Sequence, residues 1–315
     1  MPSARRSEHV PLRKGSRLLH LGAMRIMCRL LGYATDGRNL SLEEVLGHEA
    51  VVEFREISRI HNDGWGAALL AATQDEPFSK DGGAPSPETE NRYYRSTVEA
   101  ALDPAFEAFA RQPARGAIFH LRLASSNIPL IMENQQPFYS SGIAFSHNGD
   151  ISDDDGRNIV QNSDFPIDKE LFLSTGGKSD TAMYFSIVLQ ELSEGYPLEQ
   201  AVSQAIGKLR KVYPKSSYNC LIQSRDQLVC VRASGRVEIP PRISEIYKEY
   251  GVEKHALDYR AIRYREIKDK QDKQVGVVVS SSGYTQRAED GWVELQNNEL
   301  ISISNRTGEY SIRSL

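Results

Sequence analysis

Two consecutive helical stretches, flanked on both sides by short strand-like runs, limit the folds open to this chain more than any other feature. Residues 180–194 (DTAMYFSIVLQELSE) begin with Asp180 as a candidate cap, and residues 197–213 (PLEQAVSQAIGKLRKVY) begin with Pro197 at a first-turn position. Short strands are predicted on both sides of this pair; those before it lie at 49–57, 64–72, 115–125 and 141–147. Because strand and helix do not strictly alternate, the pattern favours one mixed α and β domain of layered sheets over a doubly wound fold.

A further helix and a hairpin are predicted from local patterns. The helix covers Thr97–Arg111, where apolar residues recur at helical spacing. The hairpin is SSYNCLIQSRDQLVCVRAS (216–234), whose strands carry Cys220 and Cys230. We expect both cysteines to be buried core thiols, and a cross-strand disulfide is open only if the compartment oxidises.

Three polar regions are expected at the surface. Residues 74–91 and 152–170 are rich in Gly, Pro or acidic residues, which is typical of surface segments or of lids over a cleft. Residues 240–273 mix Lys, Arg, Glu and Tyr, and we expect a charged, solvated insertion or a surface helix there.

Composition excludes several classes of protein. The 315 residues are 40% hydrophobic and 25% charged with a net charge of −4, which is ordinary for a soluble globular protein and lacks the basic excess of a nucleic-acid binder. No apolar run approaches the roughly 20 residues that cross a bilayer, so no membrane span is expected. Three cysteines are too few for a disulfide framework, which indicates a reducing compartment, and we expect the cytoplasm.

The first 27 residues differ from the rest because they hold six Arg and Lys residues against one acid, Glu8. An organellar presequence has this character, but a translation start assigned upstream of Met27 explains it more simply. We therefore expect residues 1–27 to be absent from the active protein and residues 28–315 to form its domain.

Met27 and Cys28 give this boundary a chemical meaning. Removal of Met27 leaves Cys28 as a first residue with both a thiol and a free α-amine, which titrates near about 7.7–8.0. The amine can accept the thiol proton and return it to a departing ammonia, with a thioester formed in between. An internal Cys28 could not do this, because its nitrogen would be an amide without basicity.

Other chemistry-bearing motifs fail at a required position. GGKSD (176–180) lacks the first glycine of a phosphate-binding loop, because Phe172 stands there. ISDDDG (151–156) lacks the first acid of a calcium loop, where Ile151 stands. The seven histidines form no metal-binding spacing, so we expect neither a metal nor a cofactor.

Five short pieces remain, and their joint order is informative. MCRLLGY (27–33), HNDGWG (61–66), HLRLASSNIP (120–129), SHNGDI (146–151) and KSDTAMYF (178–185) resemble the class II glutamine amidotransferases, N-terminal nucleophile hydrolases whose first mature residue is cysteine. The resemblance implies an α+β fold, the four-layer αββα sandwich of two mainly antiparallel sheets between helix layers. It also implies hydrolysis of the γ-carboxamide of glutamine to glutamate and ammonia, without a cofactor.

The resemblance assigns the catalytic chemistry to three residues. Cys28 is the nucleophile, and the Asn148 side-chain amide with the Gly149 backbone N–H forms the oxyanion hole. Such donors act on charge that develops only in the transition state. HNDGWG is expected to be mainly structural, with Trp65 in the core.

Three further residues are assigned to the substrate. Arg122 matches the arginine that clamps the glutamine α-carboxylate, Asp180 matches the acid that holds the α-ammonium, and Ser125 keeps a hydroxyl beside Arg122. The family commonly has Arg-Trp-Ala-Thr-His where this chain has an arginine followed by LASS (123–126), and Ser-Glu-Pro where it has SSG (281–283).

These departures leave alternatives open. One is a stand-alone hydrolase of a γ-glutamyl conjugate, and another, of a different class, is a catalytically silent protein that binds glutamine for regulation. Glutamine or a γ-glutamyl compound is the expected small-molecule partner. Because no synthase domain is appended, the ammonia acceptor is expected either on a separate subunit or not at all.

Overall fold

Two antiparallel sheets lie face to face in the computed structural model, which describes residues 28–70, 93–124, 129–236, 238–239 and 241–315. One sheet has seven strands, in the order β11 (Val293–Glu294), β9 (Ile262–Lys268), β10 (Gln274–Ser281), β1 (Arg29–Thr35), β4 (Gly116–Leu121), β2 (Trp65–Leu70) and β3 (Tyr93–Ser96). The other has six, in the order β13 (Tyr310–Ser314), β12 (Glu299–Ser304), β8 (Gln227–Arg232), β7 (Asn219–Gln223), β6 (Ile143–Asn148) and β5 (Phe138–Ser140).

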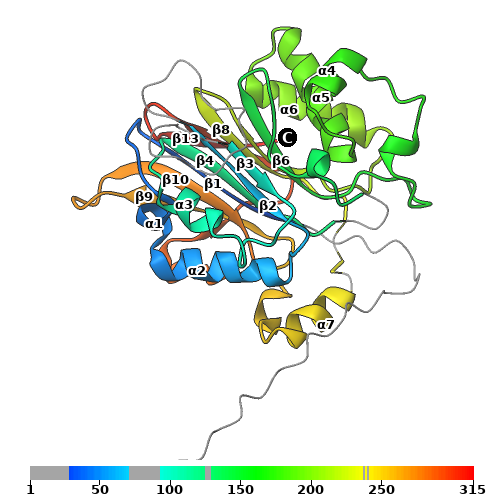
Figure 1. Cartoon of the computed structure of the whole chain (residues 1–315). Coiled ribbons are helices and arrows are strands. Elements are labelled where there is room, and N and C mark those ends of the chain that lie inside the picture. Colours follow the sequence, from blue (N-terminus) through cyan, green and yellow to red (C-terminus); the bar gives the residue numbers. More distant parts are fainter. Residues whose placement is uncertain (1–27, 71–92, 125–128, 237, 240) are drawn as a thin grey trace, which may run out of the picture.

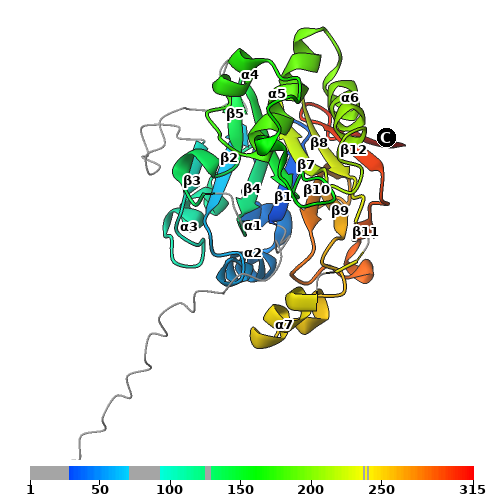
Figure 2. The same cartoon turned by 90° about the vertical axis from the view of Figure 1, so that its right-hand side faces the viewer.

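A layer of helices covers the outer face of each sheet (Figures 1 and 2). The seven-stranded sheet carries α1 (Leu42–Leu46), α2 (His48–Glu56) and α3 (Ala105–Arg111), and the six-stranded sheet carries α4 (Lys169–Ser174), α5 (Asp180–Ser193) and α6 (Leu198–Arg210). Short 3₁₀ turns are η1 (Ile57–Arg59), η2 (Met132–Asn134), η3 (Ile159–Gln161), η4 (Glu253–His255) and η5 (Ala288–Asp290). The predicted α+β, four-layer αββα sandwich is therefore confirmed.

Side-chain alternation along β1 divides the interior into layers. Leu30 packs between the two sheets, whereas Leu31 and Tyr33 pack on the other face, under α1, α2 and α3. Continued towards the start of the strand, the same alternation groups Cys28 with Leu30 and Arg29 with Leu31. The nucleophile candidate thus belongs to the inter-sheet face.

Residues 49–57 form α2 and the start of η1, so the predicted strand there is wrong. The β-branched pair Val51 and Val52 favoured a strand. The side chains that are buried, however, are Val51, Phe54 and Ile57, which are three residues apart, and this is helical spacing.

For two predicted helices, the structure differs from the prediction at the N-terminal end. The helix expected over Thr97–Arg111 is shortened to α3, because Pro104 and a turn at Asp103, whose carboxylate accepts a 3.0 Å hydrogen bond from Ala105 N, set its start. α5 begins at Asp180, but its cap is Ser179, whose hydroxyl accepts from Ala182 N. Asp180 was therefore wrongly predicted as the cap.

The hairpin of β7 and β8 forms as predicted, and its two cysteines are buried and free. Cys220 faces the α5–α6 layer, whereas Cys230 faces the inter-sheet core. Because thiols on opposite faces of one sheet cannot reach each other, this structure excludes the cross-strand disulfide.

Residues 240–273 divide into two parts. α7 (Pro241–Glu249) and η4 lie beside the sandwich, as a surface helix was expected to do (Figure 1). β9, in contrast, pairs with both β10 and β11, so this half is part of the sheet and not a solvated insertion.

No helix among the described residues has the length and apolar character needed to cross a membrane. The expected surface segment at 152–170 contains η3, and its Asn158 lies against Asp180. The expected segment at 74–91, the extension 1–27 and Ser125 lie outside the described residues.

Candidate active site

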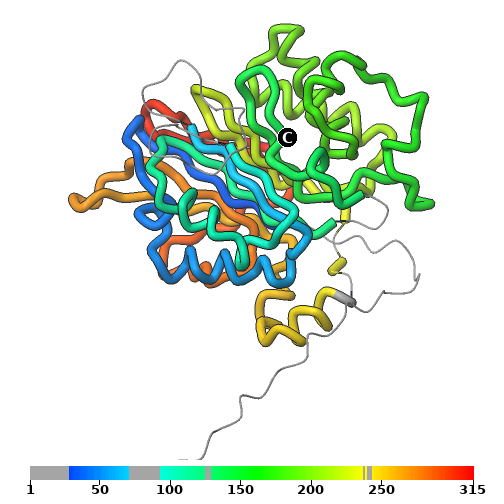
Figure 3. Tube along the Cα trace, viewed as in Figure 1, coloured from blue at the N-terminus to red at the C-terminus, as the bar shows by residue number. Residues whose placement is uncertain are grey.

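The candidate site lies where β1 begins, at one end of the sandwich. β1 runs between β4 and β10, and the trace in Figure 3 shows this early strand beside one from near the end of the chain. Cys28 directly precedes β1, and its thiol donates to the carbonyl of Leu123, just beyond β4, with an Sγ–O distance of 3.7 Å. Only a protonated thiol can make this bond.

Burial raises the pKa of the Cys28 thiol to about 11. The charge of Arg122 lowers this pKa, and the nearby Asp63 carboxylate raises it. At neutral pH the thiol therefore keeps its proton, and a nucleophilic role for Cys28 would require a base that removes it.

Three buried histidines surround this end of the sandwich, but none of them suits that task. Burial lowers the pKa of His120 to about 3, and it lowers the pKa of His61 and of His147 as well. Burial disfavours the charged imidazolium that each ring would have to become on taking the thiol proton. The base is therefore to be sought elsewhere than in these three rings.

Arg122 is buried and has hydrogen-bonding capacity to spare. Its Nη2 donates to the Pro129 carbonyl at 3.3 Å, while Nη1 has no partner among the described residues. Burial lowers the pKa of Arg122, whereas the charges of Cys28, Asp63 and Asp180 raise it. An orphaned guanidinium donor beside the thiol suits a carboxylate ligand.

Asn148 ends β6 with an amide that is only loosely held. Its Nδ2 donates to Ser281 Oγ at 3.5 Å, and its buried Oδ1 has no partner among the described residues. Ser281, at the end of β10, also accepts from Leu30 N at 2.9 Å, so it links Asn148 to the nucleophile strand. The triple serine at 280–282 was the available sequence signal, and its link to Asn148 was missed.

Gly149 follows Asn148 at a point where no side chain fits. A Cβ there would lie 2.2 Å from the Ser217 carbonyl oxygen and 2.5 Å from His147 Nε2. Glycine is therefore required by the close approach of the next strand and not by an unusual backbone angle.

A hydrogen-bond network fixes His147 and, with it, the end of β6. His147 Nε2 lies 2.7 Å from the Ser217 carbonyl oxygen and must donate to it, so Nδ1 accepts from the Thr181 hydroxyl at 3.1 Å. Gln136 donates to Thr181 and accepts from His147 N. The residues directly after His147, which are the predicted oxyanion donors, are thus held on a rigid base.

Asp180 is the first residue of α5, with its carboxylate turned inwards. Its Oδ2 accepts from Ile151 N at 3.0 Å and from Asn158 Nδ2 at 3.2 Å, and Oδ1 accepts from Thr181 N at 2.8 Å. Burial raises the pKa of Asp180 and the Asp150 charge raises it further, whereas the hydrogen bond from Ile151 N lowers it. One lone-pair position is left for a cationic ligand.

The HNDGWG turn has both a structural and an electrostatic part. Trp65 is fully buried, as predicted, and Gly64 has φ of +119° with a Cβ position 2.2 Å from the Ser96 carbonyl oxygen. Asp63 accepts from Ala124 N at 2.7 Å and so holds the segment after β4. Its effect on the pKa of Cys28 was not foreseen.

Some of the predicted site residues therefore lie close together at the start of β1. Arg122 lies within electrostatic reach of both Cys28 and Asp180, and Asn148 reaches the nucleophile strand through Ser281. The roles given to them stay predictions. Among the residues that the structure describes, no cluster of three His, Cys, Asp or Glu side chains could hold a metal ion.

Comparison with known proteins places this arrangement in a family. The family model for class-II glutamine amidotransferases matches residues 27–313. A search of curated proteins by sequence gave no match.

Two solved structures are similar at low identity. One is a glutamine aminotransferase class-II domain protein from Silicibacter pomeroyi, with 20% identity, a TM-score of 0.54, and coverage of 91% of this chain and 99% of that chain. The other is the glutamine phosphoribosylpyrophosphate amidotransferase of B. subtilis, with 14% identity, a TM-score of 0.50, and coverage of 91% of this chain but 49% of that one. At these identities the likeness shows the fold alone, and this chain spans about half the length of the second protein.

Proposed function

This chain belongs to the class-II glutamine amidotransferases, and from that premise we propose that it hydrolyses the side-chain amide of glutamine with Cys28 as an N-terminal nucleophile. One observation carries the proposal. The buried thiol, of pKa about 11, lies within electrostatic reach of the Arg122 guanidinium, whose Nη1 has no partner among the described residues, and burial lowers the pKa of the three histidines at this end of the sandwich. An α-amine on Cys28 would supply the missing base near neutral pH.

The proposed reaction has two steps. In the first, Cys28 Sγ attacks the amide carbon, the thiol proton passes to the α-amine, and the negative oxygen is held by Asn148 Nδ2 and the Gly149 N–H. The C–N bond then breaks, and ammonia leaves with the proton from the ammonium. In the second, water attacks the thioester carbon and the α-amine takes a proton from it; the C–S bond then breaks, the ammonium returns the proton to the departing sulfur, and glutamate and the thiol are released.

Substrate orientation is proposed to come from two buried charges. Arg122 Nη1 would bind the α-carboxylate, because it is buried and has no partner among the described residues. Asp180 would bind the α-ammonium, which would favour its ionised form against the effect of burial. A ligand that carries both groups at one carbon is an α-amino acid.

The domain that acts is proposed to be 28–315, with residues 1–27 removed or never made. The B. subtilis protein is an amidotransferase for phosphoribosylpyrophosphate and about twice as long as the part matched here. By analogy, we propose that ammonia passes to a separate acceptor subunit if it is not simply released. A γ-glutamyl conjugate remains the alternative substrate, since the stretch LASS (123–126) departs from the family pattern.

The test is a comparison of chains that begin at Cys28 with chains that begin at Met1. Mass spectrometry of the N-terminus is read together with ammonia release from glutamine and glutamate release from γ-glutamyl amides and thiol conjugates. We expect activity only in the chain that begins at Cys28, and none in Cys28→Ala. Full activity of Cys28→Ala, or of a chain that retains Met1, would refute the mechanism, and a preference for conjugates would favour the alternative substrate.

A further inference from the structure

Arg29, the residue directly after the nucleophile candidate, is a fully buried cation. Among the described residues, no carboxylate forms an ion pair with it. A buried charge without an opposite charge is costly unless its hydrogen bonds are supplied in another way. The contacts that offset this cost therefore indicate what the side chain is for.

The guanidinium group of Arg29 is held by three neighbours. Its Nη1 donates to the Cys28 carbonyl at 2.9 Å and to the Tyr259 carbonyl at 3.5 Å, and its Nη2 donates to the Tyr247 hydroxyl. Its Cζ lies 4.3 Å from the centre of the Tyr259 ring and 5.9 Å from that of Tyr247. Two aromatic faces and two carbonyl oxygens take the place of a counter-ion.

Both tyrosines come from the segment 241–261, which the sequence presented only as charged and solvent-exposed. Tyr247 and Tyr259 are fully buried in a small cluster of their own with Ile60, Ile243 and Ala256. The Tyr247 hydroxyl also lies 3.2 Å from His61 Nε2, so that the turn before β2 supports it.

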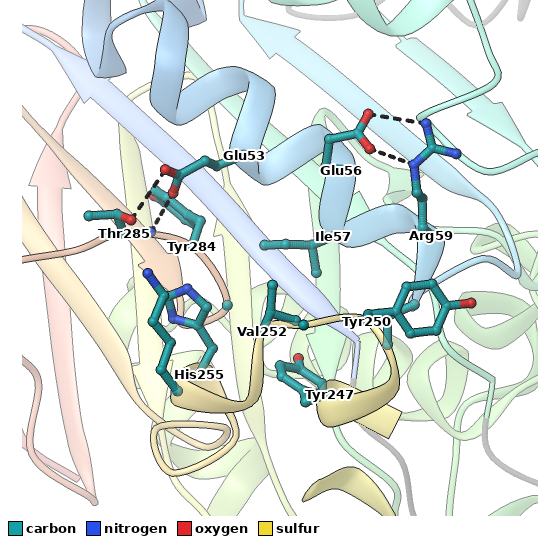
Figure 4. A pocket seen from close by; sticks show the side chains of 14 residues that line it. Glu53, Glu56, Ile57, Arg59, Tyr247, Tyr250, Val252, His255, Tyr284 and Thr285 are labelled. Atoms are coloured by element: carbon teal, nitrogen blue, oxygen red, sulfur yellow. Dashed lines mark hydrogen bonds and ion pairs between the residues drawn. The ribbon is translucent and has the colours of Figure 1, made fainter. Parts of the chain in front are cut away.

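The outer side of this segment faces α2 across an open pocket (Figure 4). Tyr247 and Val252 line the pocket opposite Ile57, Tyr284 and Thr285 lie at one side of it, and Gly283 is among its lining residues. Its volume is about 340 Å³. On this side, therefore, the segment is not packed against the helix layer throughout.

Gly283 leaves room for the Arg29 side chain. Its φ is +127°, and a Cβ there would lie 3.2 Å from Arg29 Nε. The preceding Ser282 binds the segment, because its N donates to the Ala261 carbonyl at 3.1 Å. The departure from Ser-Glu-Pro at 281–283 thus coincides with the path of the arginine.

We propose that Arg29 is the positioning residue of the nucleophile: clamped by Tyr247 and Tyr259, it holds the Cys28 carbonyl and so fixes the directions of the Cys28 amine and thiol. The inference rests on the proposed function, because it matters most if Cys28 is the first residue. A terminal residue has one peptide neighbour, and rotation about its Cα–C bond is restrained only by contacts to the carbonyl and the side chain. Misplacing a reacting group by about 1 Å can cost about 100-fold in rate.

Arg29 also acts on Cys28 through its charge. Burial is the main effect and raises the pKa of the Cys28 thiol, Asp63 raises it further, and Arg122 and Arg29 lower it. Besides Cys28, the titratable groups that interact with Arg29 are His61, His255, Tyr247 and Tyr259, and burial lowers the pKa of both histidines. A neutral residue at position 29 should therefore raise the thiol pKa.

The experiment uses the chain that begins at Cys28 and four variants: Arg29→Met, Arg29→Lys, Tyr247→Phe and Tyr250→Phe. Steady-state hydrolysis of glutamine gives kcat and KM, and the rate of Cys28 alkylation by iodoacetamide is followed against pH. Cys28→Ala serves as the alkylation blank, because Cys220 and Cys230 are buried thiols whose pKa burial raises.

We expect Arg29→Met to lower kcat about 10- to 100-fold with KM changed less than about 3-fold, and to move the alkylation profile to higher pH. Arg29→Lys keeps the charge but not the planar fork, so it should restore the alkylation profile and recover kcat only in part. Tyr247→Phe should lower kcat several-fold. Tyr250→Phe, the same change at an exposed position of the segment, should leave both readouts unchanged.

A wild-type kcat in Arg29→Met and Tyr247→Phe, or a rise in KM in place of a fall in kcat, overturns the inference. If Arg29→Met does not fold, Arg29→Lys and Tyr247→Phe decide by the same criteria. If the protein does not hydrolyse glutamine at all, the proposed function fails, and alkylation then decides alone. A shift in Arg29→Met still supports control of Cys28 by Arg29, and an unchanged profile overturns it.

Discussion

Asn148→Ala should separate catalysis from stability more clearly than any other change in the site. The variant would lose one of the two proposed oxyanion donors, and such a loss typically costs about 2.7–4 kcal/mol of transition-state stabilisation, or about 10²–10³-fold in kcat. The folded state should hardly change. The amide makes one 3.5 Å contact, to Ser281, and its buried Oδ1 has no partner among the described residues. Losing the contact of Nδ2 to Ser281 costs at most about 1 kcal/mol. Removing the buried, unpaired Oδ1 relieves a desolvation penalty of about 1–3 kcal/mol.

The assay combines glutamine kinetics with denaturant unfolding of the same preparations. We expect kcat of Asn148→Ala to fall at least about 100-fold, KM to change little, and the free energy of unfolding to stay within about 1 kcal/mol of wild type or to rise. That pattern is expected of a group that acts only in the transition state.

Asn219→Ala is the matched control, because Asn219 is the cross-strand partner of Asn148. Its Oδ1 accepts from Ala233 N at 2.7 Å, and truncation would leave that buried N–H unpaired at a cost of about 1–3 kcal/mol. This control should lose stability and keep kcat within about 3-fold. The reasoning is refuted if Asn148→Ala keeps its kcat, or if it loses more than about 2 kcal/mol of stability.

Three further changes test other parts of the site. Arg122→Met should raise KM for glutamine about 30- to 100-fold and abolish the preference for glutamine over glutaminamide, which lacks the carboxylate; a preserved preference would contradict the assigned clamp. Gly149→Ala should destabilise the protein by about 1–3 kcal/mol or more in denaturant, because the new Cβ would lie 2.2 Å from the Ser217 carbonyl oxygen. The pKa of His120 is about 3 in the folded state and about 6.5 in the unfolded state, so the folded state binds fewer protons. The stability that neutral His120 contributes is therefore fully present above pH 6.5 and is lost as the pH falls. Between pH 8 and 5 His120 should account for about 2 kcal/mol of this loss, and His120→Leu should be less sensitive to acid; equal sensitivity would show that His120 is not buried neutral.

Sequence patterns predicted the layers of the fold better than they predicted the individual elements. The pair α5 and α6 and the hairpin of β7 and β8 were found because each has a strong period and clear turn residues at its ends. The α2 region was misread because two adjacent valines outweighed a three-residue spacing of buried side chains. The strand β9 was missed because its charged residues were taken as a sign of a solvated segment, and five of its seven residues are indeed not fully buried. The pairing of such a strand with two neighbours is a tertiary property that local composition does not carry.

Apart from Cys28, which the Met27–Cys28 pair singled out, the candidate site could be predicted only where the resemblance supplied the residues. Cys28 and Arg122 are 94 positions apart, and spacing alone gives no reason to bring them together. Two residues near Cys28 were missed for a related reason. Ser281 acts through its hydroxyl at a strand end, and Arg29 follows the candidate nucleophile without an ion pair to any carboxylate among the described residues. A serine or an arginine of this kind is common at a protein surface, and only the folded environment makes it informative.

Strand alternation explains why the site lies where it does. Along β6 the inter-sheet face carries Ala144, in the core, and the same parity leads to Asn148 at the end of the strand. Along β10 the same alternation places Ser281, at the end of the strand, on the inter-sheet face with Val279. The site is therefore the polar end of the inter-sheet core, where two sheets supply donors from facing strands. A shift of one residue in the register of β1 would carry Cys28 to the outer face and bring Arg29 between the sheets. The contacts that hold Arg29 on the outer face therefore hold the thiol on the inner one, so the segment 241–261, although it lies outside the sandwich, contributes to the geometry of a site inside it.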